Sequence, residues 1–328
     1  MNWTKNLLPG LLPDLAREAW WKLMADGVPP RERSWPIPRA ELEDVVIRWP
    51  TAYSDLHTSR FVGFLVWGLR RRVKWEIRDI PQPYPLVVVF EFEVQGVAYR
   101  HAIDVADLDP VNAEAAASCD LVFKFQFSGD GYRQDNVMRG GYVPKGPDLY
   151  AYLPHLRKLR DRNSNRHDVY GRFSSRVGTE VRTRAATLLS EQTDFRYTGG
   201  LAKVRYIRSL EEAARSRVCL DLPGNGAFCY RLVENLAIGS CIVGPAPRNG
   251  MPVPLEDGVH MAFCKPDLSD LVERCSHYLE HEDERLRLVQ GSRDYFDRYL
   301  HREQISDYYL RCCLDHHRKA SRAKSRSR

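Results

Sequence analysis

Long apolar runs are scarce in this chain of 328 residues. The longest covers residues 61–69, which is too short to cross a bilayer. The first ten residues also lack the basic start and apolar stretch of a secretion signal. We therefore expect a cytoplasmic protein that has at most peripheral contact with a membrane.

Paired cysteines are missing as well. No two of the eight cysteines form a C-x-x-C pair, and most of them stand in apolar runs: Cys119, Cys219, Cys229, Cys241, Cys264, Cys275, Cys312 and Cys313. This pattern indicates reduced core residues rather than a disulfide framework or a zinc site.

Acidic residues are absent from the last eleven positions, where six basic residues account for the whole net charge of +6: Arg318, Lys319, Arg322, Lys324, Arg326 and Arg328. The rest of the chain is neutral, which argues against nucleic acid as a partner. We expect residues 318–328 to be disordered and to attract anionic lipid.

Residues 217–245 hold the most informative pattern in the chain. An apolar run over residues 218–222 is followed by the turn residues 223–226. From Ala227 the apolar residues recur at steps of three and four, as on one face of a helix that Gly239 ends. A second apolar run over 241–243 completes a strand, turn, helix and strand, which predicts parallel-sheet construction.

A glycine turn before a helix is a place where α/β proteins bind phosphate groups. Gly224 and Gly226 supply the start of a dinucleotide fingerprint, but Cys229 stands where its third glycine is needed. No acid follows the second strand to hold a ribose. The sequence therefore does not indicate a nicotinamide-dependent enzyme.

Arg231 and Glu234 lie on the first turns of the same predicted helix. The arginine can neutralise a diphosphate through two parallel hydrogen bonds, and the carboxylate can accept both hydroxyls of a ribose. The alternative is an ordinary βαβ unit in which the two side chains form a solvated pair worth about 0.3 kcal/mol.

This stretch resembles the donor half of GT-B glycosyltransferases, of the exostosin-like and group 1-like type. The resemblance rests on the glycine turn, the R-x-x-E pattern at 231–234, and the small residue and glycine before the apolar strand. The resemblance covers about residues 165–300. It implies an α/β fold with two Rossmann-like domains that face each other across a cleft. It also implies a donor site formed by Gly224, Asn225, Gly226, Tyr230, Arg231 and Glu234.

Two further basic residues are candidates for the donor phosphates. Arg172 matches the family only by its position at the end of a predicted strand, and the alternative is a solvated arginine in a loop. Lys203 lies near the start of a predicted helix, where Arg205 and Arg208 are rivals.

The predicted organisation follows the resemblance. We expect a Trp- and Pro-rich segment over 1–44 with a helix at 13–26, an acceptor-side domain over 45–157, a polar linker over 158–167, a nucleotide-sugar domain over 168–300, a closing helix over 301–317 that crosses back onto the first domain, and the basic tail.

The first domain is predicted to have strands at 45–49, 73–77, 86–93, 97–104 and 121–127, with helices at 59–72 and 109–117. Asp109 is expected to cap the second helix, and Lys124 and Gln126 to lie on the polar side of the last strand. The second domain is predicted to have strands at 168–173, 195–197, 218–222, 241–243 and 260–264, with helices at 179–192, 204–214, 268–279 and 282–300.

Chemistry in open α/β sheets takes place outside the carboxyl ends of the strands. Asp104 and Asp107 follow one predicted strand and Asp130 follows the next, so Asp130 and Asp104 are the candidate catalytic bases, with His101 as a further option. Each of them can instead serve as a turn or capping residue, and a retaining transfer needs no such base.

The sequence predicts a glycosyltransferase that moves a sugar from a nucleotide sugar to a glycan or other hydroxyl acceptor, without a metal or other cofactor. The D-x-D pattern that holds a metal in other transferases occurs only at 107–109, outside the donor half. Two alternatives stay open: a non-catalytic nucleotide- or glycan-binding protein, and a sugar-nucleotide epimerase.

Overall fold

The computed structural model describes residues 30, 32–55, 58–162, 165–174 and 177–326. The chain forms two compact units. Among the described residues, the first unit comprises 30–143, 248–254 and 297–326, and the second comprises 144–247 and 255–296. The helix predicted at 13–26, with the rest of residues 1–29, lies outside the described residues.

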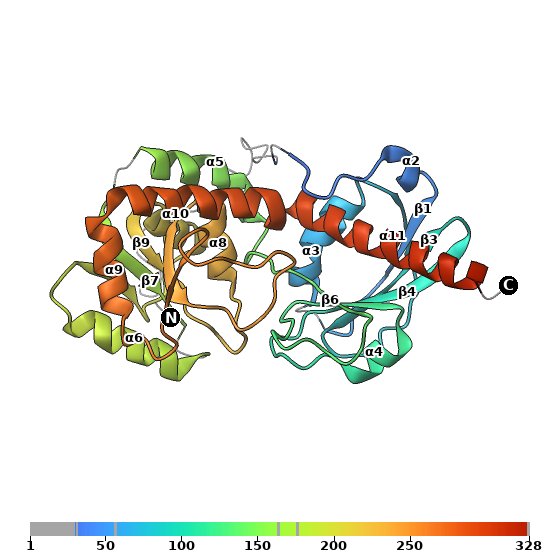
Figure 1. The fold of residues 1–328 in the computed structure, drawn as a ribbon, viewed down its shortest axis with the longest axis horizontal. Coiled ribbons are helices and arrows are strands. Elements are labelled where there is room, and N and C mark those ends of the chain that lie inside the picture. The colour runs from blue at the N-terminus through green and yellow to red at the C-terminus, as the bar shows by residue number, and fades with distance from the viewer. Residues whose placement is uncertain (1–29, 31, 56–57, 163–164, 175–176, 327–328) are drawn as a thin grey trace, which may run out of the picture. The chain divides into compact units, whose positions relative to one another are not determined.

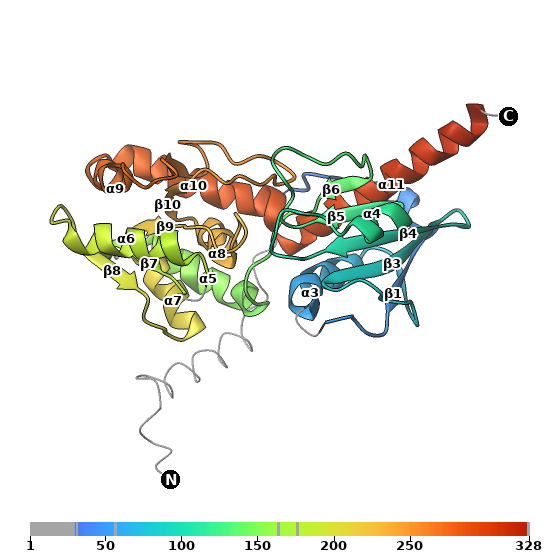
Figure 2. The same cartoon turned by 90° about the horizontal axis from the view of Figure 1, so that it is seen from below.

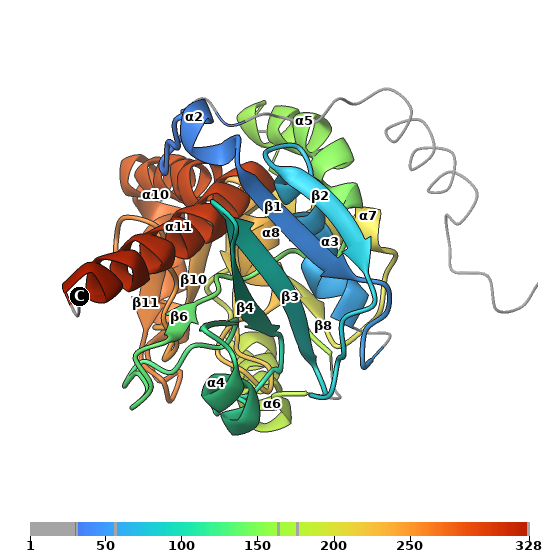
Figure 3. The same ribbon diagram turned by 90° about the vertical axis from the view of Figure 1, so that its right-hand side faces the viewer.

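The first unit contains a six-stranded sheet in the order β2-β1-β3-β4-β5-β6 (Figure 3). Its strands are β1 (Val45–Pro50), β2 (Lys74–Arg78), β3 (Val87–Val94), β4 (Val97–Asp104), β5 (Leu121–Lys124) and β6 (Val137–Arg139). Strand β3 is antiparallel to both of its neighbours, and the other pairs are parallel. All but β6 were predicted from the sequence; β6 is too short to show an apolar period.

The turn between β3 and β4 forms at the predicted position. Gln95 and Gly96 both have positive φ, 52° and 73°, and Val94 pairs with Val97. A two-residue hairpin loop with two positive φ angles matches the twist of the strands that it joins. The register of β4 follows from this turn, and Asp104 lies at the end of that strand.

Lys124 and Gln126, which were expected on the polar side of their strand, are both fully buried, because both faces of this sheet are covered. On one face Phe123 stacks on Tyr309 at 3.9 Å between ring centroids, and on the other Val122 packs with the helix α4 (Ala113–Ser118). The buried Lys124 ammonium is neutralised by Asp104, with 3.1 Å from Nζ to Oδ1.

Helix α4 also begins later than predicted. Asn112, not Asp109, caps it, because the Asn112 Oδ1 accepts a hydrogen bond from the backbone N–H of Ala115 at 2.9 Å. The Asp109 carboxylate is bonded elsewhere, to the side-chain amide of Asn249 at 3.0 Å.

The second unit contains a five-stranded parallel sheet in the order β11-β10-β9-β7-β8. Its strands β7 and β9 are labelled in Figure 1. Its strands are β7 (His167–Arg172), β8 (Tyr197–Gly200), β9 (Ser216–Leu220), β10 (Cys241–Pro245) and β11 (Ala262–Cys264). Its helices are α5 (Asp148–Asp161), α6 (Thr179–Glu191), α7 (Tyr206–Ala214), α8 (Tyr230–Ile238), α9 (Leu271–Glu280) and α10 (Glu282–Tyr295). The predicted series of strands and helices is confirmed, and Gly239 ends α8 with φ 81° as expected.

Helix α5 was not predicted, and the first four residues of the predicted polar linker belong to it. Its two arginines are buried rather than solvated, since they bond to the ends of neighbouring elements. Arg157 donates to the carbonyl of Ala237 at 2.9 Å, and Arg160 donates to the hydroxyl of Ser240 at 3.0 Å. The units accordingly divide at residues 143 and 144, before α5.

The C-terminal segment returns to the first unit, as the closing helix was expected to do. After a π-helical turn (Phe296–Leu300), helix α11 (Arg302–Arg326) packs on α3 (Thr58–Leu69); α11 is the long red helix that ends at the C-terminus in Figure 2. The remaining helix of this unit is α2 (Arg39–Leu42).

The predicted disorder of the basic tail is wrong as far as residue 326, where α11 ends. Extending an existing helix fixes one residue for each hydrogen bond gained, so the tail continues a helix that packing has already nucleated. In the part of the chain that the structure describes, no helix is both long and apolar enough to span a membrane.

Helices α3 and α11 approach closely at Gly68, which yields a test of their packing. A Cβ at this position would lie 2.1 Å from the hydroxyl oxygen of Ser306. We expect Gly68→Ala to lower the free energy of unfolding by about 1–3 kcal/mol, because the helices must separate. Urea denaturation measures the change.

Gly63 supplies the control on the same helix, since a Cβ there meets no atom within 4 Å. We expect Gly63→Ala to raise the free energy of unfolding by about 0.5–1 kcal/mol through helix propensity alone. Equal effects of the two substitutions would contradict the close packing of α11 on α3.

Candidate functional site

The strand order of the second unit identifies where a ligand can bind. In chain order the strands lie as 2-1-3-4-5, the doubly wound arrangement in which the direction of winding reverses between the first and third strands. Here those strands are β7 and β9. The loops that leave their carboxyl ends start at Phe173 and Asp221, and a ligand site is expected between them.

The glycine turn follows β9 at this edge. The backbone N–H of Gly224 donates to the carbonyl of Gly226 at 3.0 Å, and Asn225 between them is exposed. Arg182 of α6 holds the turn through the carbonyl of Pro223 at 3.0 Å. Gly178, which has φ 57°, permits this contact, because a Cβ there would lie 2.6 Å from the same carbonyl oxygen.

Arg231 lies at the reversal point itself. Its guanidinium donates to the carbonyl of Arg172 at the end of β7 (3.0 Å) and to the carbonyl of Leu222 after β9 (3.3 Å). Its Nε lies 3.5 Å from the Oδ1 of Asp221, and the guanidinium stacks 4.6 Å from the ring centroid of Phe173. One side chain therefore ties the two strand ends together, and its side chain is only 17% exposed.

Asp221 is buried opposite this guanidinium. Burial raises the pKa of its carboxyl group, while the charge of Arg231 and a hydrogen bond from Cys229 oppose that shift. The thiol of Cys229 lies 3.1 Å from the Asp221 Oδ1, and burial raises the pKa of that thiol to about 12. Cys229, which occupies the place of the third fingerprint glycine, is thus a neutral donor to Asp221.

Glu234, one turn along α8, is also buried. Its Oε1 accepts hydrogen bonds from the hydroxyl of Tyr206 at 2.8 Å and from the backbone N–H of Lys145 at 3.1 Å. Its Oε2 makes no hydrogen bond with the described residues. Burial raises the pKa of this carboxyl group, and the bonds from Tyr206 and Lys145 oppose the shift. The alternative of a solvated Arg231–Glu234 pair is wrong, since Glu234 is buried, Arg231 is largely covered, and each has partners of its own.

The other predicted donor residues differ in placement. Arg172 forms a bidentate ion pair with Glu212 of α7, at 2.6 and 3.2 Å, so its side chain is neither solvated nor directed at Arg231. Lys203 is exposed in the loop before α7, and Tyr230 is half-buried on the first turn of α8. The structure therefore groups the glycine turn with Arg231 and, one helical turn away, Glu234.

The candidate bases belong to the first unit. Asp130 is exposed in a turn that the Gly131 N–H closes onto the carbonyl of Ser128 at 3.0 Å. Asp104 is buried, and besides Lys124 it accepts hydrogen bonds from the backbone N–H groups of Ala106 and Asn112.

His101 is fully buried, and neither ring nitrogen has a hydrogen-bond partner among the described residues. Burial and the neighbouring His316 lower the pKa of its imidazole to about 3. The ring therefore stays neutral near pH 7, and no proton route to a substrate is visible at this position.

Several contributing residues escaped the sequence analysis. Asp221 could have been predicted from the sequence, because an acid directly after a buried strand stands at the edge where ligands bind. No sequence pattern indicates Arg182, Lys145 or Tyr206, since they come from distant loops and helices that meet the glycine turn or α8 only in the fold.

A double substitution separates the structural role of Arg231 from ligand binding. Arg231→Met leaves the buried Asp221 without a cation, so the free energy of unfolding should fall by about 3–5 kcal/mol. Adding Asp221→Asn should recover most of this loss, because the remaining side chains are neutral. Urea denaturation of both variants provides the measurement.

Arg208 is the matched control, since it is 49% exposed and pairs with Glu212 on the same helix. Arg208→Met should change the free energy of unfolding by less than about 1 kcal/mol. If the double variant were as unstable as Arg231→Met alone, Asp221 would not depend on Arg231 for its charge.

The buried Glu234 also predicts a pH dependence. Its pKa in the folded protein is raised above the ordinary value of 4.5, so its contribution to stability is greatest below that pH and is lost as the pH rises through the folded pKa. The free energy of unfolding of Glu234→Gln, relative to the unsubstituted protein, should therefore rise with pH from 4.5 upward. A difference that fell with pH in urea denaturation would contradict the raised pKa.

Comparison with known families agrees with this geometry. Residues 156–311 match the family described as Glycosyl transferase-like, and no curated protein matches the chain. The matched stretch begins in α5, includes all five strands of the second unit and contains Asp221, Arg231 and Glu234. The two α/β units also agree with the two Rossmann-like domains of a GT-B fold. Residues 156–311 are therefore similar to a glycosyltransferase-like domain.

Proposed function

We propose that the protein transfers a sugar from a nucleotide sugar to a hydroxyl acceptor, and that the donor binds at the carboxyl ends of β7 and β9. The observation that carries this proposal is that two charged groups lie on consecutive turns of α8: Arg231, whose side chain is 17% exposed, and the buried Glu234. Arg231 pairs with the buried Asp221, and such an ion pair is often no more stabilising than apolar side chains of the same volume, and can be worse by about 1–4 kcal/mol. Such groups at a ligand-binding edge favour a role in binding.

In this proposal the diphosphate of the donor lies against the N–H groups of Asn225 and Gly226 in the glycine turn and the guanidinium of Arg231. The Oε2 of Glu234 accepts the ribose hydroxyls, while Tyr206 and Lys145 fix the carboxylate from the other oxygen. Negative charge develops on the departing nucleoside diphosphate in the transition state, and these preorganised donors stabilise it. The transfer is proposed to need no metal.

Asp130 is the better of the two candidate bases. A general base needs a lone pair that can reach the acceptor hydroxyl. Asp104 is buried and bonded on both oxygens, whereas Asp130 is exposed. We propose that Asp130 takes the acceptor proton if the transfer inverts the sugar configuration.

The proposal also covers the cellular compartment and the acceptor of the reaction. All eight cysteines are free, as in a reducing compartment, so we place the protein in the cytoplasm. The acceptor would be a glycan, as in polysaccharide biosynthesis. The basic end of α11 would bring the protein into peripheral contact with an anionic membrane.

One observation favours a non-catalytic binding protein as the second candidate. Arg231 already makes three hydrogen bonds inside the protein, to two carbonyls and to the thiol of Cys229. A ligand phosphate must therefore share or displace these bonds.

Turnover assays separate the candidates. The protein is incubated with nucleotide sugars and glycan acceptors in the presence of a chelator, and the released nucleoside diphosphate and the transferred sugar are both quantified. Transfer that resists the chelator supports the proposal. Conversion of the donor without an acceptor indicates an epimerase, and no turnover despite nucleotide binding indicates the non-catalytic protein.

Substitution of Asp130 tests the proposed base. Asp130→Asn should lower kcat by about 10²–10⁴-fold, the usual contribution of general base catalysis. Asp135, another exposed acid of the same loop, is the control, and Asp135→Asn should leave kcat unchanged. Equal kcat values for the two variants would remove Asp130 from the mechanism.

A further inference from the structure

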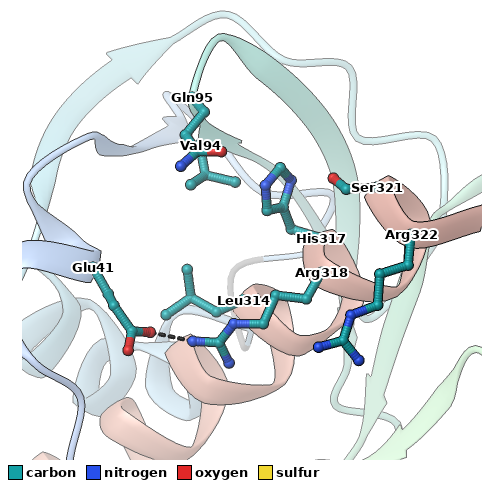
Figure 4. A pocket seen from close by; sticks show the side chains of 8 residues that line it. All are labelled: Glu41, Val94, Gln95, Leu314, His317, Arg318, Ser321 and Arg322. Atoms are coloured by element: carbon teal, nitrogen blue, oxygen red, sulfur yellow. Dashed lines mark hydrogen bonds and ion pairs between the residues drawn. The ribbon is translucent and has the colours of Figure 1, made fainter. Parts of the chain in front are cut away.

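A pocket in the first unit lies well outside the donor site. Its volume is about 310 Å³, and it is formed by α2, the β3–β4 turn and the last turns of α11. The lining residues are Glu41, Val94, Gln95, Leu314, His317, Arg318, Ser321 and Arg322 (Figure 4). None of these residues has a part in the proposed transfer.

The two arginines of the pocket differ in their partners. Arg318 is neutralised twice, by Glu41 and by Asp315, the latter at 2.6 Å. Arg322 is exposed, and its guanidinium makes no hydrogen bond or ion pair with the described part of the chain. Because the residues are four positions apart on one helix, they project from the same face, as Figure 4 shows. Arg322 therefore brings an uncompensated positive charge to the pocket.

Apolar side chains also line the pocket. Val94 and Leu314 are each 4% exposed, and they lie beside the polar side chains of His317 and Ser321. His317 is held in place by a hydrogen bond of 3.0 Å between its Nδ1 and the hydroxyl of Tyr99. The pocket thus combines a cation, further polar groups and an apolar surface.

The charge around this pocket favours an anion. Among the described side chains near the end of α11, Arg318 is paired with Glu41 and Asp315, whereas Lys319 and Arg322 are exposed. The C-terminal end of a helix contributes the equivalent of only about half a negative charge, which is less than the charge of these two residues.

We propose that this pocket binds the phosphate group of an anionic lipid. The guanidinium of Arg322 would pair with the phosphate through charge-assisted hydrogen bonds. Val94 and Leu314 would contact the adjoining glycerol and acyl carbons. The pocket specifies which residues would make the membrane contact proposed above. This proposal does not depend on the donor site in the second unit.

The test uses the full chain and vesicles of phosphatidylcholine with and without phosphatidylglycerol. Arg322→Ala should weaken binding to the anionic vesicles by about fivefold or more, since each basic residue near such a surface contributes about 1 kcal/mol. Glu41→Gln, which removes one of the two carboxylates that pair with Arg318, should strengthen it. Arg287→Ala on α10 removes one exposed arginine from the second unit and should leave binding unchanged.

Soluble glycerol phosphate distinguishes the sources of the phosphate. Glycerol phosphate is tested for competition with the vesicles and for binding to the protein in their absence. If Arg322→Ala abolishes this binding, the phosphate site is supported even where the protein does not bind the lipid. Equal losses for Arg322→Ala and Arg287→Ala, or no loss for Arg322→Ala, would overturn the site and leave only general charge attraction. Preference for an RNA oligomer over the anionic vesicles would also overturn it.

Two further readouts keep the outcomes separate. Thermal unfolding of each variant verifies that it folds, which we expect for exposed side chains. The affinity of Arg322→Ala for nucleoside diphosphates should equal that of the unsubstituted protein, so a failure of the lipid site is distinguishable from a failure of the donor site.

Discussion

The contact of Arg231 with Asp221 and two strand ends is the constraint on which the second unit's functional edge depends. A parallel sheet leaves carbonyl groups at its carboxyl ends without strand partners, and here a guanidinium bonds to one after β7 and one after β9. The same group opposes the rise in pKa that burial causes at the Asp221 carboxyl group. The result is a charged, water-poor edge whose geometry is fixed before any ligand arrives.

This arrangement accounts for the position of Glu234. It lies three residues after Arg231, which places it one turn along α8 on a neighbouring part of the helix surface. Tyr206 from α7 and the backbone of Lys145 occupy one of its oxygens. A carboxylate held in this way loses little rotamer entropy when it binds a ribose. The free energy of the contacts is then offset less by the cost of ordering the side chain.

The sequence predicted most of the second unit because parallel strands are buried on both faces and read as unbroken apolar runs. The β9–turn–α8–β10 unit, the cap at Gly239 and the pair Arg231 and Glu234 all came from local patterns. Tertiary contacts decided the rest. The sequence does not show that Lys124 is buried beside Asp104, and the last residues of α5 resemble a polar linker because its arginines bond to distant carbonyls.

In the first unit, too, the sequence alone does not distinguish between the candidate bases. Asp104 and Asp130 occupy equivalent positions in sequence, each after a strand, and nothing local separates them. The fold does so, since Lys124 draws Asp104 into the interior while Asp130 stays in an exposed turn. Charges in α/β sheets therefore need their partners identified before a catalytic role is assigned.

The central claim is that α8 and the glycine turn form a nucleotide site. Isothermal titration calorimetry with UDP, GDP, ADP, CMP and dTDP tests it most directly, on the unsubstituted protein and on Glu234→Ala. One nucleotide should bind at micromolar affinity, and the variant should lose about 1.5–3 kcal/mol, the value of hydrogen bonds to a charged group. If no nucleotide binds, or if the variant binds as tightly as the unsubstituted protein, this edge of the sheet is not the donor site.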